Sequence, residues 1–365
     1  MSSVLFTEHA TKDGQIIGEI RLNAEKSLNA LTLDMIDLIQ PKLDEWRDDT
    51  NVVAVLLDSA GDKAFCAGGD IVNLYKAMVA EDTDFPEQFF TREYRLDYTL
   101  HTYPKPVICW GSGIVMGGGM GLMNGCSHRV VTETSHLAMP EVTIGLYPDV
   151  GGSWFLNRMP GGTGLFLGLT GNPINAADAL FLGLADRALT VDMRDGMLQR
   201  LQSEHWGEDA GGVVSRVLRE LEDECRDTFE AMPAPIRAHE ALIREVTDHD
   251  SVEEMVEALL AVESDDKWVK RAQKAISHGS PLSIKMIHEQ LHRCRHLSLK
   301  EVFQHELILS VQCCRHRELQ EGVRALLIDK DGQPNWTFDS IEEVDPTFLA
   351  GMFESPWKQH PLADM

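Results

Sequence analysis

The chain has 365 residues, in which 33 lysine and arginine residues face 58 aspartate and glutamate residues, giving a formal net charge of −25. This length allows one core of roughly 200 to 250 residues with an appendage, and this charge excludes nucleic acid and anionic membrane surfaces as expected partners. Seven cysteines without a CxxC pair predict reduced thiols, and the absence of a basic leader or a long apolar run predicts a cytoplasmic protein without a membrane span.

The first half of the chain alternates predicted strands and helices. Residues 4–9 and 15–22 predict a β-hairpin with Asp13 and Gly14 in the turn. Thr32 is placed to cap a helix, residues 52–57 form an apolar run typical of a strand buried on both faces, and Asp70 is placed to cap a helix over 71–80. Another helix is expected over 89–102. This alternation, which continues to about residue 190, indicates a layered α/β core with crossover connections.

The pattern becomes helical from about residue 195. We therefore expect an α/β catalytic core over 1–195, a helical C-terminal region over 196–344, and an irregular tail over 345–365. The helices expected in the second part are 213–221, 252–262, 266–276, 282–291 and 298–311.

A cluster of glycines at 117–119 follows the apolar run 106–110. Glycines let the backbone approach a ligand closely, and the N–H groups at a helix start favour negative charge. A second glycine turn occurs at Gly68 and Gly69. The two turns predict an anion or oxyanion site, unless the glycines only allow tight packing of a helix on a strand.

Two carboxylates, Glu141 and Asp149, follow the glycine cluster. A carboxylate beside a reacting carbonyl can act as a general base or as a nucleophile. The structural alternatives are a helix-start carboxylate for Glu141 and a helix N-cap for Asp149.

Four segments in register carry a resemblance to a known family. They are Lys26 to Leu31, Ala64 to Asp70, Met116 to Gly121, and Met139 to Glu141. Together they resemble the crotonase (enoyl-CoA hydratase/isomerase) superfamily over roughly residues 5 to 190. The resemblance implies a spiral of ββα units with a helical C-terminal region, a trimer or hexamer, and acyl-CoA thioesters as ligands.

The resemblance also implies roles for particular residues. The backbone N–H groups of Ala67 and Gly118 would form an oxyanion hole, Glu141 and Asp149 would be the reacting carboxylates, and Glu93 would line the acyl pocket. No metal ion or organic prosthetic group is expected. The residues expected to contact the substrate besides Glu93 are Gly68, Gly69, Asp70, Gly117, Lys26 and Leu28.

Some of these assignments have simpler alternatives. Glu93 lies on a predicted amphipathic helix, where a charged residue is usually solvated or paired with a neighbour such as Arg92 or Arg95. Lys26 and Lys63 could meet the phosphates of coenzyme A, because an anionic ligand needs local positive charge on an acidic protein. Surface lysines are common, however.

Within the superfamily, three segments resemble the branch that hydrolyses 3-hydroxyisobutyryl-CoA in valine breakdown: residues 89–94, 147–152 and 321–331. Hydratases of the family carry a second glutamate where this chain has Gly121, and usually a glycine where it has Asp149. Thioester hydrolysis is therefore expected, with a hydratase or isomerase of the same fold as the alternative. Whether Glu141 would attack carbon or activate water stays open.

A competing motif is His288-Glu-Gln-Leu-His292, which matches the HExxH pattern of zinc hydrolases. No third ligand is marked at the spacing of the longer zinc signature. The apolar stripe Ile284, Ile287 and Leu291 favours an ordinary amphipathic helix instead.

Overall fold

The computed structural model describes residues 2–365, and the chain divides into two compact units. Unit 1 comprises the chain up to residue 69 together with residues 96–137 and 174–234. Unit 2 comprises residues 70–95, 138–173 and 235–365. The units therefore interleave along the sequence. No helix within residues 2–365 is both long and apolar enough to cross a bilayer.

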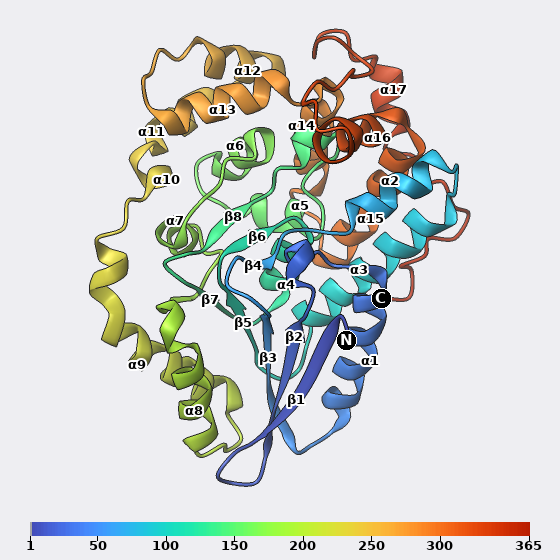
Figure 1. Cartoon of the computed structure of the whole chain (residues 1–365). Helices are drawn as coiled ribbons and strands as arrows, with labels where there is room; N and C mark the ends of the chain where they lie inside the picture. Colours follow the sequence, from blue (N-terminus) through green and yellow to red (C-terminus); the bar gives the residue numbers. More distant parts are fainter. Residues whose placement is uncertain (1) are drawn as a thin grey trace. The chain divides into compact units, whose positions relative to one another are not determined.

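Unit 1 is built on a six-stranded sheet in the order β1-β2-β3-β5-β7-β9 (Figure 1). The predicted hairpin is confirmed, because β1 and β2 pair antiparallel and Gly14 in the turn has φ +81°. The remaining strands run parallel to β2, as crossover connections require. The strands are β1 (Val4–Ala10), β2 (Ile16–Leu22), β3 (Val52–Ser59), β5 (Val107–Gly111), β7 (His128–Val131) and β9 (Arg187–Ala188).

A smaller sheet consists of β4 (Ala64–Cys66), β6 (Ile114–Met116) and β8 (His136–Ala138), in that order. β4 and β6 are parallel neighbours. Since each ends directly before one of the glycine turns, both turns leave the sheet at the same edge.

The helices of unit 1 begin where the sequence offers caps. α1 (Leu33–Asp48) begins after Thr32, whose side chain accepts a hydrogen bond from the N–H of Met35 at 3.2 Å, as predicted. α8 (Arg194–Ser203) and α9 (Ala210–Glu230) follow one another in the chain (Figure 1). They bury Leu198, Val217 and their neighbours against the apolar side chains of the large sheet. The other α-helices of the unit are α4 (Gly118–Gly125) and α7 (Ala176–Phe181).

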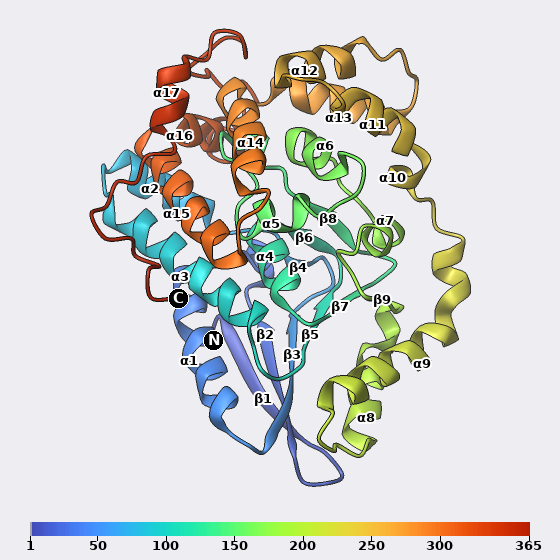
Figure 2. The same cartoon turned by 180° about the vertical axis from the view of Figure 1, so that it is seen from behind.

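Unit 2 is mainly helical (Figure 2). From residue 196 onward the described chain forms helices and no strand, in agreement with the expected helical region. The helices of unit 2 are α2 (Ile71–Val79), α3 (Asp84–His101, which continues into unit 1), η2 (Glu141–Ile144), α5 (Gly152–Leu156), α6 (Thr163–Thr170), α10 (Pro235–Ala238), α11 (Glu240–Thr247), α12 (Val252–Ala261), α13 (Lys267–His278), α14 (Pro281–Cys294), α15 (Leu299–Arg315), α16 (Arg317–Val323), η4 (Arg324–Ile328) and α17 (Pro346–Gly351).

Caps that were not recognised account for two of the differences from the sequence expectation; α9 also extends beyond the expected 213–221, to Glu230. α3 begins at Asp84 rather than near residue 89, since the side chain of Asp82 accepts from the backbone N–H groups at its start, at 3.0 and 3.2 Å. α17 lies in the stretch expected to be irregular. There the side chain of Asp345 accepts from the N–H of Thr347 at 2.9 Å.

Candidate active site

The two glycine turns of unit 1 touch one another. A Cβ atom on Gly119 would lie 2.2 Å from the carbonyl oxygen of Cys66, and one on Gly68 would lie 3.7 Å from that of Met116. Only glycine therefore fits at position 119. The close approach sets the backbone around residues 66–68 against the start of α4.

The N–H groups at these turns differ in their availability. Gly117, with φ 48°, is the N-cap of α4 and supplies no side chain, and the N–H of Gly118 has no acceptor within residues 2–365. The N–H of Ala67, in contrast, donates to the carbonyl oxygen of Leu28 at 3.1 Å. The N–H of Gly68 has no acceptor in the described chain. Of the two expected oxyanion donors, the structure leaves Gly118 free and Ala67 engaged, with Gly68 as a free neighbour.

The other expected substrate contacts of this region fall into two groups. Lys26 and Lys63 are exposed, whereas Gly69 forms a parallel bridge with Leu31. Asp70 caps α2 as predicted, because its carboxylate accepts from the backbone and the side-chain amide of Asn73 at 3.1 and 2.5 Å. Both oxygens of Asp70 are therefore occupied by the helix start.

Unit 2 brings three of the predicted carboxylates together. Glu93 on α3, Glu141 at the start of η2 and Asp149 before α5 are 2%, 5% and 4% exposed. Burial, followed by the charges of Asp149 and Glu141, raises the pKa of Glu93 well above its usual value. Burial and the charge of Asp149 do the same to the pKa of Glu141. One oxygen of Glu93 and one of Glu141 are buried without a hydrogen-bond partner in the described chain, so both can still bind a ligand.

The alternative interpretation of Glu93 as a solvated or paired surface residue is wrong. Its side chain is buried, and the two arginines considered as its partners are directed elsewhere. Arg92 donates to Gln88 at 3.3 Å, and Arg95 pairs with Asp364 at 2.7 Å.

Asp149 is held by a buried network of hydroxyl groups that the sequence did not reveal. The phenol of Tyr94 donates to the Asp149 carboxylate at 2.6 Å and lies 2.6 Å from the hydroxyl of Ser310. The phenol of Tyr147 lies 2.8 Å from the same serine and donates to the carbonyl oxygen of Glu306 at 2.7 Å. The hydrogen bonds of Tyr94 and Tyr147 therefore connect Asp149 and the residues just before it to α15.

Glu306 on α15 fixes the backbone immediately after Asp149. Its carboxylate accepts from the N–H of Gly151 at 2.7 Å and from that of Ser153 at 2.9 Å, at the start of α5. Glu306, and not Asp149, therefore caps this helix, which overturns the N-cap alternative for Asp149. Burial raises the pKa of Glu306 to about 8, although these two donors oppose the shift. A glutamate among the apolar residues of the predicted helix 298–311 is the sequence signal that could have revealed the role of Glu306.

The carboxylates differ in how readily they ionise. Burial raises the pKa of Asp149 to about 6, and the hydrogen bond from Tyr94 opposes that shift. Glu141 and Glu93 lack such a donor, and their pKa values are raised well above the usual range. Burial therefore raises the pKa of all three carboxyl groups, and only at Asp149 does a side-chain hydrogen bond oppose the shift.

The two histidines of the HExxH pattern lie one turn apart on α14. Within residues 2–365, no group of three or more His, Cys, Asp or Glu side chains is arranged to hold a metal ion. The zinc alternative therefore has no set of ligands in the described chain.

Comparison with known proteins agrees with the fold. The enoyl-CoA hydratase/isomerase family matches residues 17–353. The chain belongs to this family, the crotonase superfamily, and the match extends through the helical region. In sequence it is 37% identical over 341 residues to "3-hydroxyisobutyryl-CoA hydrolase, mitochondrial" of Danio rerio, covering 93% of this chain and 87% of the relative. It is 35% identical over 353 residues to the Homo sapiens protein of the same name, covering 93% and 86%.

Solved structures carry other names. A structure described as an enoyl-CoA hydratase from Rhodobacter sphaeroides 2.4.1 aligns with a TM-score of 0.83 at 32% identity, covering 97% of this chain and 98% of that one. One described as a carnitinyl-CoA dehydratase from Mycobacterium thermoresistibile aligns with a TM-score of 0.86 at 32% identity, covering 99% and 98%. The expected crotonase-like fold is confirmed, whereas the names of its relatives span several reactions.

Proposed function

We propose that the enzyme hydrolyses a short β-hydroxyacyl-CoA thioester, 3-hydroxyisobutyryl-CoA, to 3-hydroxyisobutyrate and coenzyme A, a step of valine breakdown. The observation that carries the proposal is the buried group of Glu93, Glu141 and Asp149, in which Tyr94 keeps Asp149 ionisable. The names of the curated relatives support the same reaction.

In the proposed reaction, the oxygen of water bonds to the thioester carbonyl carbon and its proton passes to a carboxylate of the pair Glu141 and Asp149. Negative charge develops on the carbonyl oxygen and is stabilised by the free N–H of Gly118 with a second donor, Ala67 or Gly68. The C–S bond then breaks and the thiolate takes up the proton. Losing one such donor costs about 2.7 to 4 kcal/mol in comparable sites.

Glu141 could instead attack the carbonyl carbon directly and form a mixed anhydride that water then opens. Both routes give the same products. In either route Asp149 would accept a hydrogen bond from the substrate β-hydroxyl or hold the leaving group, and Glu93 would line the acyl pocket. The exposed side chains of Lys26 and Lys63 are available for the phosphates of coenzyme A, and neither route uses a metal ion or a prosthetic group.

The second candidate is hydration of an enoyl-CoA, favoured by the printed names of the two solved structures. It meets the difficulty that Gly121 stands where the hydratases carry their second glutamate. The deciding experiment is to measure thiol release and double-bond loss over a panel of short acyl-CoAs. Thiol release fastest on 3-hydroxyisobutyryl-CoA supports the proposal, and double-bond loss on crotonyl-CoA without thiol release would refute it.

Two further expectations stay predictions. The curated relatives are named mitochondrial, so the expected cytoplasmic location gains no support from them and needs fractionation of the source cell. The expected trimer or hexamer can be measured by light scattering.

A further inference from the structure

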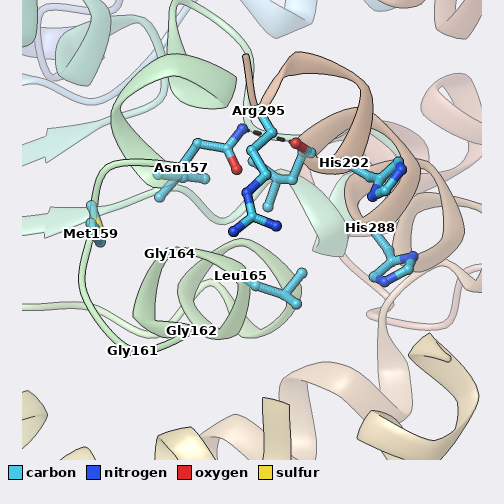
Figure 3. A pocket seen from close by; sticks show the side chains of 11 residues that line it. Asn157, Met159, Gly161, Gly162, Gly164, Leu165, His288, His292 and Arg295 are labelled. Atoms are coloured by element: carbon cyan, nitrogen blue, oxygen red, sulfur yellow. Dashed lines mark hydrogen bonds between the residues drawn. The ribbon is translucent and has the colours of Figure 1, made fainter. Parts of the chain in front are cut away.

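A pocket of about 350 Å³ lies within unit 2, between α6 and α14 (Figure 3), and none of the three buried carboxylates lines it. We call it the α6–α14 pocket. Its lining includes His288, His292 and Arg295 but no aspartate or glutamate. In a chain with 58 acidic residues and a net charge of −25, a pocket with basic groups and no acid is a local exception.

The exposed side chain of Arg295 carries the fixed positive charge of the pocket. Burial lowers the pKa of His288, although the charges of Glu289 and Glu253 oppose this shift, so His288 contributes hydrogen-bonding capacity rather than a fixed charge. The side chains of His288, His292 and Arg295 form no hydrogen bond or ion pair with any residue in the described range 2–365. The acid that shares their helix is already engaged, because Glu289 pairs with Arg293 at 2.7 Å. The three basic side chains therefore keep their donors available.

These three residues recur along α14 and its C-terminus at positions i, i+4 and i+7, which places them on one side of the helix. Figure 3 shows the side chain of Arg295 directed from α14 toward the first turn of α6, where Gly164 and Leu165 lie. Asn157 is fixed beside it, since its amide donates to the carbonyl oxygen of Leu291 at 2.9 Å.

The facing wall of the pocket is the N-terminus of α6. Its N-cap is Gly162, with φ 78° and no side-chain cap, and the N–H groups of Gly164 and Leu165 have no acceptor in the described chain. A side chain at position 162 is excluded, because a Cβ atom there would lie 2.1 Å from the hydroxyl of Thr247. The helix therefore presents uncovered donors and its positive end to the same pocket as Arg295.

We propose that the α6–α14 pocket binds a phosphate-bearing anion. Arg295 is the principal contact, because a planar guanidinium matches two phosphate oxygens at once. His288 and His292 add donors, and the first turn of α6 adds backbone N–H groups of the kind that bind phosphate at helix N-termini. The volume admits a diphosphate or a small phosphate ester. A metal ion in place of the anion would be repelled by Arg295.

The test is a calorimetric titration of the full chain with pyrophosphate at constant ionic strength. The wild-type protein should bind saturably, and Arg295→Gln should weaken binding by about tenfold or more, the scale of one lost charge-assisted contact. The double variant His288→Gln/His292→Gln should weaken it as well. Arg315→Gln is the matched control, because it removes the same charge from an exposed position of unit 2 outside the pocket and breaks no ion pair in the described chain, and its affinity should stay within about twofold of the wild type.

The proposal is overturned if the wild type shows no saturable binding, or if Arg315→Gln and Arg295→Gln weaken it equally. Either result would leave only general attraction to surface charge. These outcomes are independent of the thioesterase assay, which tests the proposed function separately.

Two sources of phosphate are distinguished by kinetics. If the phosphates of coenzyme A occupy the pocket, Arg295→Gln raises KM for an acyl-CoA but not for the corresponding acyl-pantetheine, and pyrophosphate competes with the acyl-CoA. If a separate phosphorylated metabolite occupies it, both KM values stay unchanged and pyrophosphate still binds when coenzyme A is saturating. Either pattern, together with the loss of binding in Arg295→Gln, supports the anion site and names its ligand.

Discussion

Replacing Tyr94 with phenylalanine should move the acid limb of the pH–rate profile. The substitution removes only the hydroxyl that donates to Asp149 at 2.6 Å and keeps the ring, which packs on Phe90 and Phe303 at centroid distances of 5.7 and 5.8 Å. A hydrogen bond to a charged group contributes about 1.5 to 3 kcal/mol. At 1.36 kcal/mol per pKa unit, its loss corresponds to a shift of about one to two units.

The direction of the pKa shift follows from which protonation form of Asp149 the hydrogen bond stabilises. The hydrogen bond favours the carboxylate, so its loss raises the pKa of Asp149 from about 6 toward roughly 7 to 8. If turnover needs the ionised form of Asp149, kcat/KM at pH 7 should fall about two- to tenfold and recover near pH 9. The assay is thiol release from the acyl-CoA substrate between pH 5 and 9.

The matched control is Tyr147→Phe. It also removes a buried phenol that contacts Ser310, but this phenol donates to the carbonyl oxygen of Glu306 rather than to Asp149. Its acid limb should stay near that of the wild type. Superimposable pH–rate profiles for the wild type and Tyr94→Phe would refute the assignment of Tyr94 as the residue that positions Asp149 and lowers its pKa. Equal shifts of the acid limb in Tyr94→Phe and Tyr147→Phe would refute it as well.

Three further perturbations test other parts of the structure. Glu141→Gln should remove most turnover while acyl-CoA affinity stays within about tenfold, and near-normal thiol release in this variant would contradict the proposed role. As pH rises from 4 to 7, the free energy of unfolding of Asp149→Asn should increase relative to that of the wild type, by up to about 3 kcal/mol. The reason is that a raised carboxyl pKa stabilises the wild-type fold only at low pH, and this contribution is lost as pH rises through about 6. Urea unfolding measures the difference between the two proteins, and a difference that does not change with pH would count against burial of the charge. Gly119→Ala should lower kcat, since its methyl group would lie 2.2 Å from the carbonyl oxygen of Cys66. Gly196→Ala is the control and should leave kcat unchanged, because its methyl group would have no atom within 4 Å. Equal kcat values in both variants would show that activity does not need the contact between the glycine turns.

Local patterns predicted the parts of the chain that depend on near neighbours. The hairpin around Gly14, the cap of α1 by Thr32 and the cap of α2 by Asp70 each involve residues a few positions apart. The segments that resemble the family also predicted Glu141 and Asp149 as site residues, and the structure buries both of them together with Glu93.

What supports Asp149 could not be predicted in the same way. Glu306 and Gly151 are 155 residues apart, and Tyr94 and Ser310 are 216 apart. No spacing rule connects such positions, because the pairs form only when α15 packs in unit 2. The hydrogen bond from the N–H of Ala67 to the carbonyl oxygen of Leu28 could not be predicted either. It depends on the direction of that carbonyl group, and Leu28 adopts a left-handed conformation with φ 54° that composition does not encode.

The attachment of the loop after Asp149 to α15 has a consequence for synthesis. A chain emerging from the ribosome exposes Glu141 and Asp149 long before it exposes Glu306 and Ser310. Until α15 is complete, the N–H groups of Gly151 and Ser153 lack their acceptor, Tyr147 lacks both of its partners, and Tyr94 lacks Ser310. We therefore expect a fragment that stops before residue 299 to contain every predicted reacting residue and yet to be inactive, so that activity begins only near the end of translation.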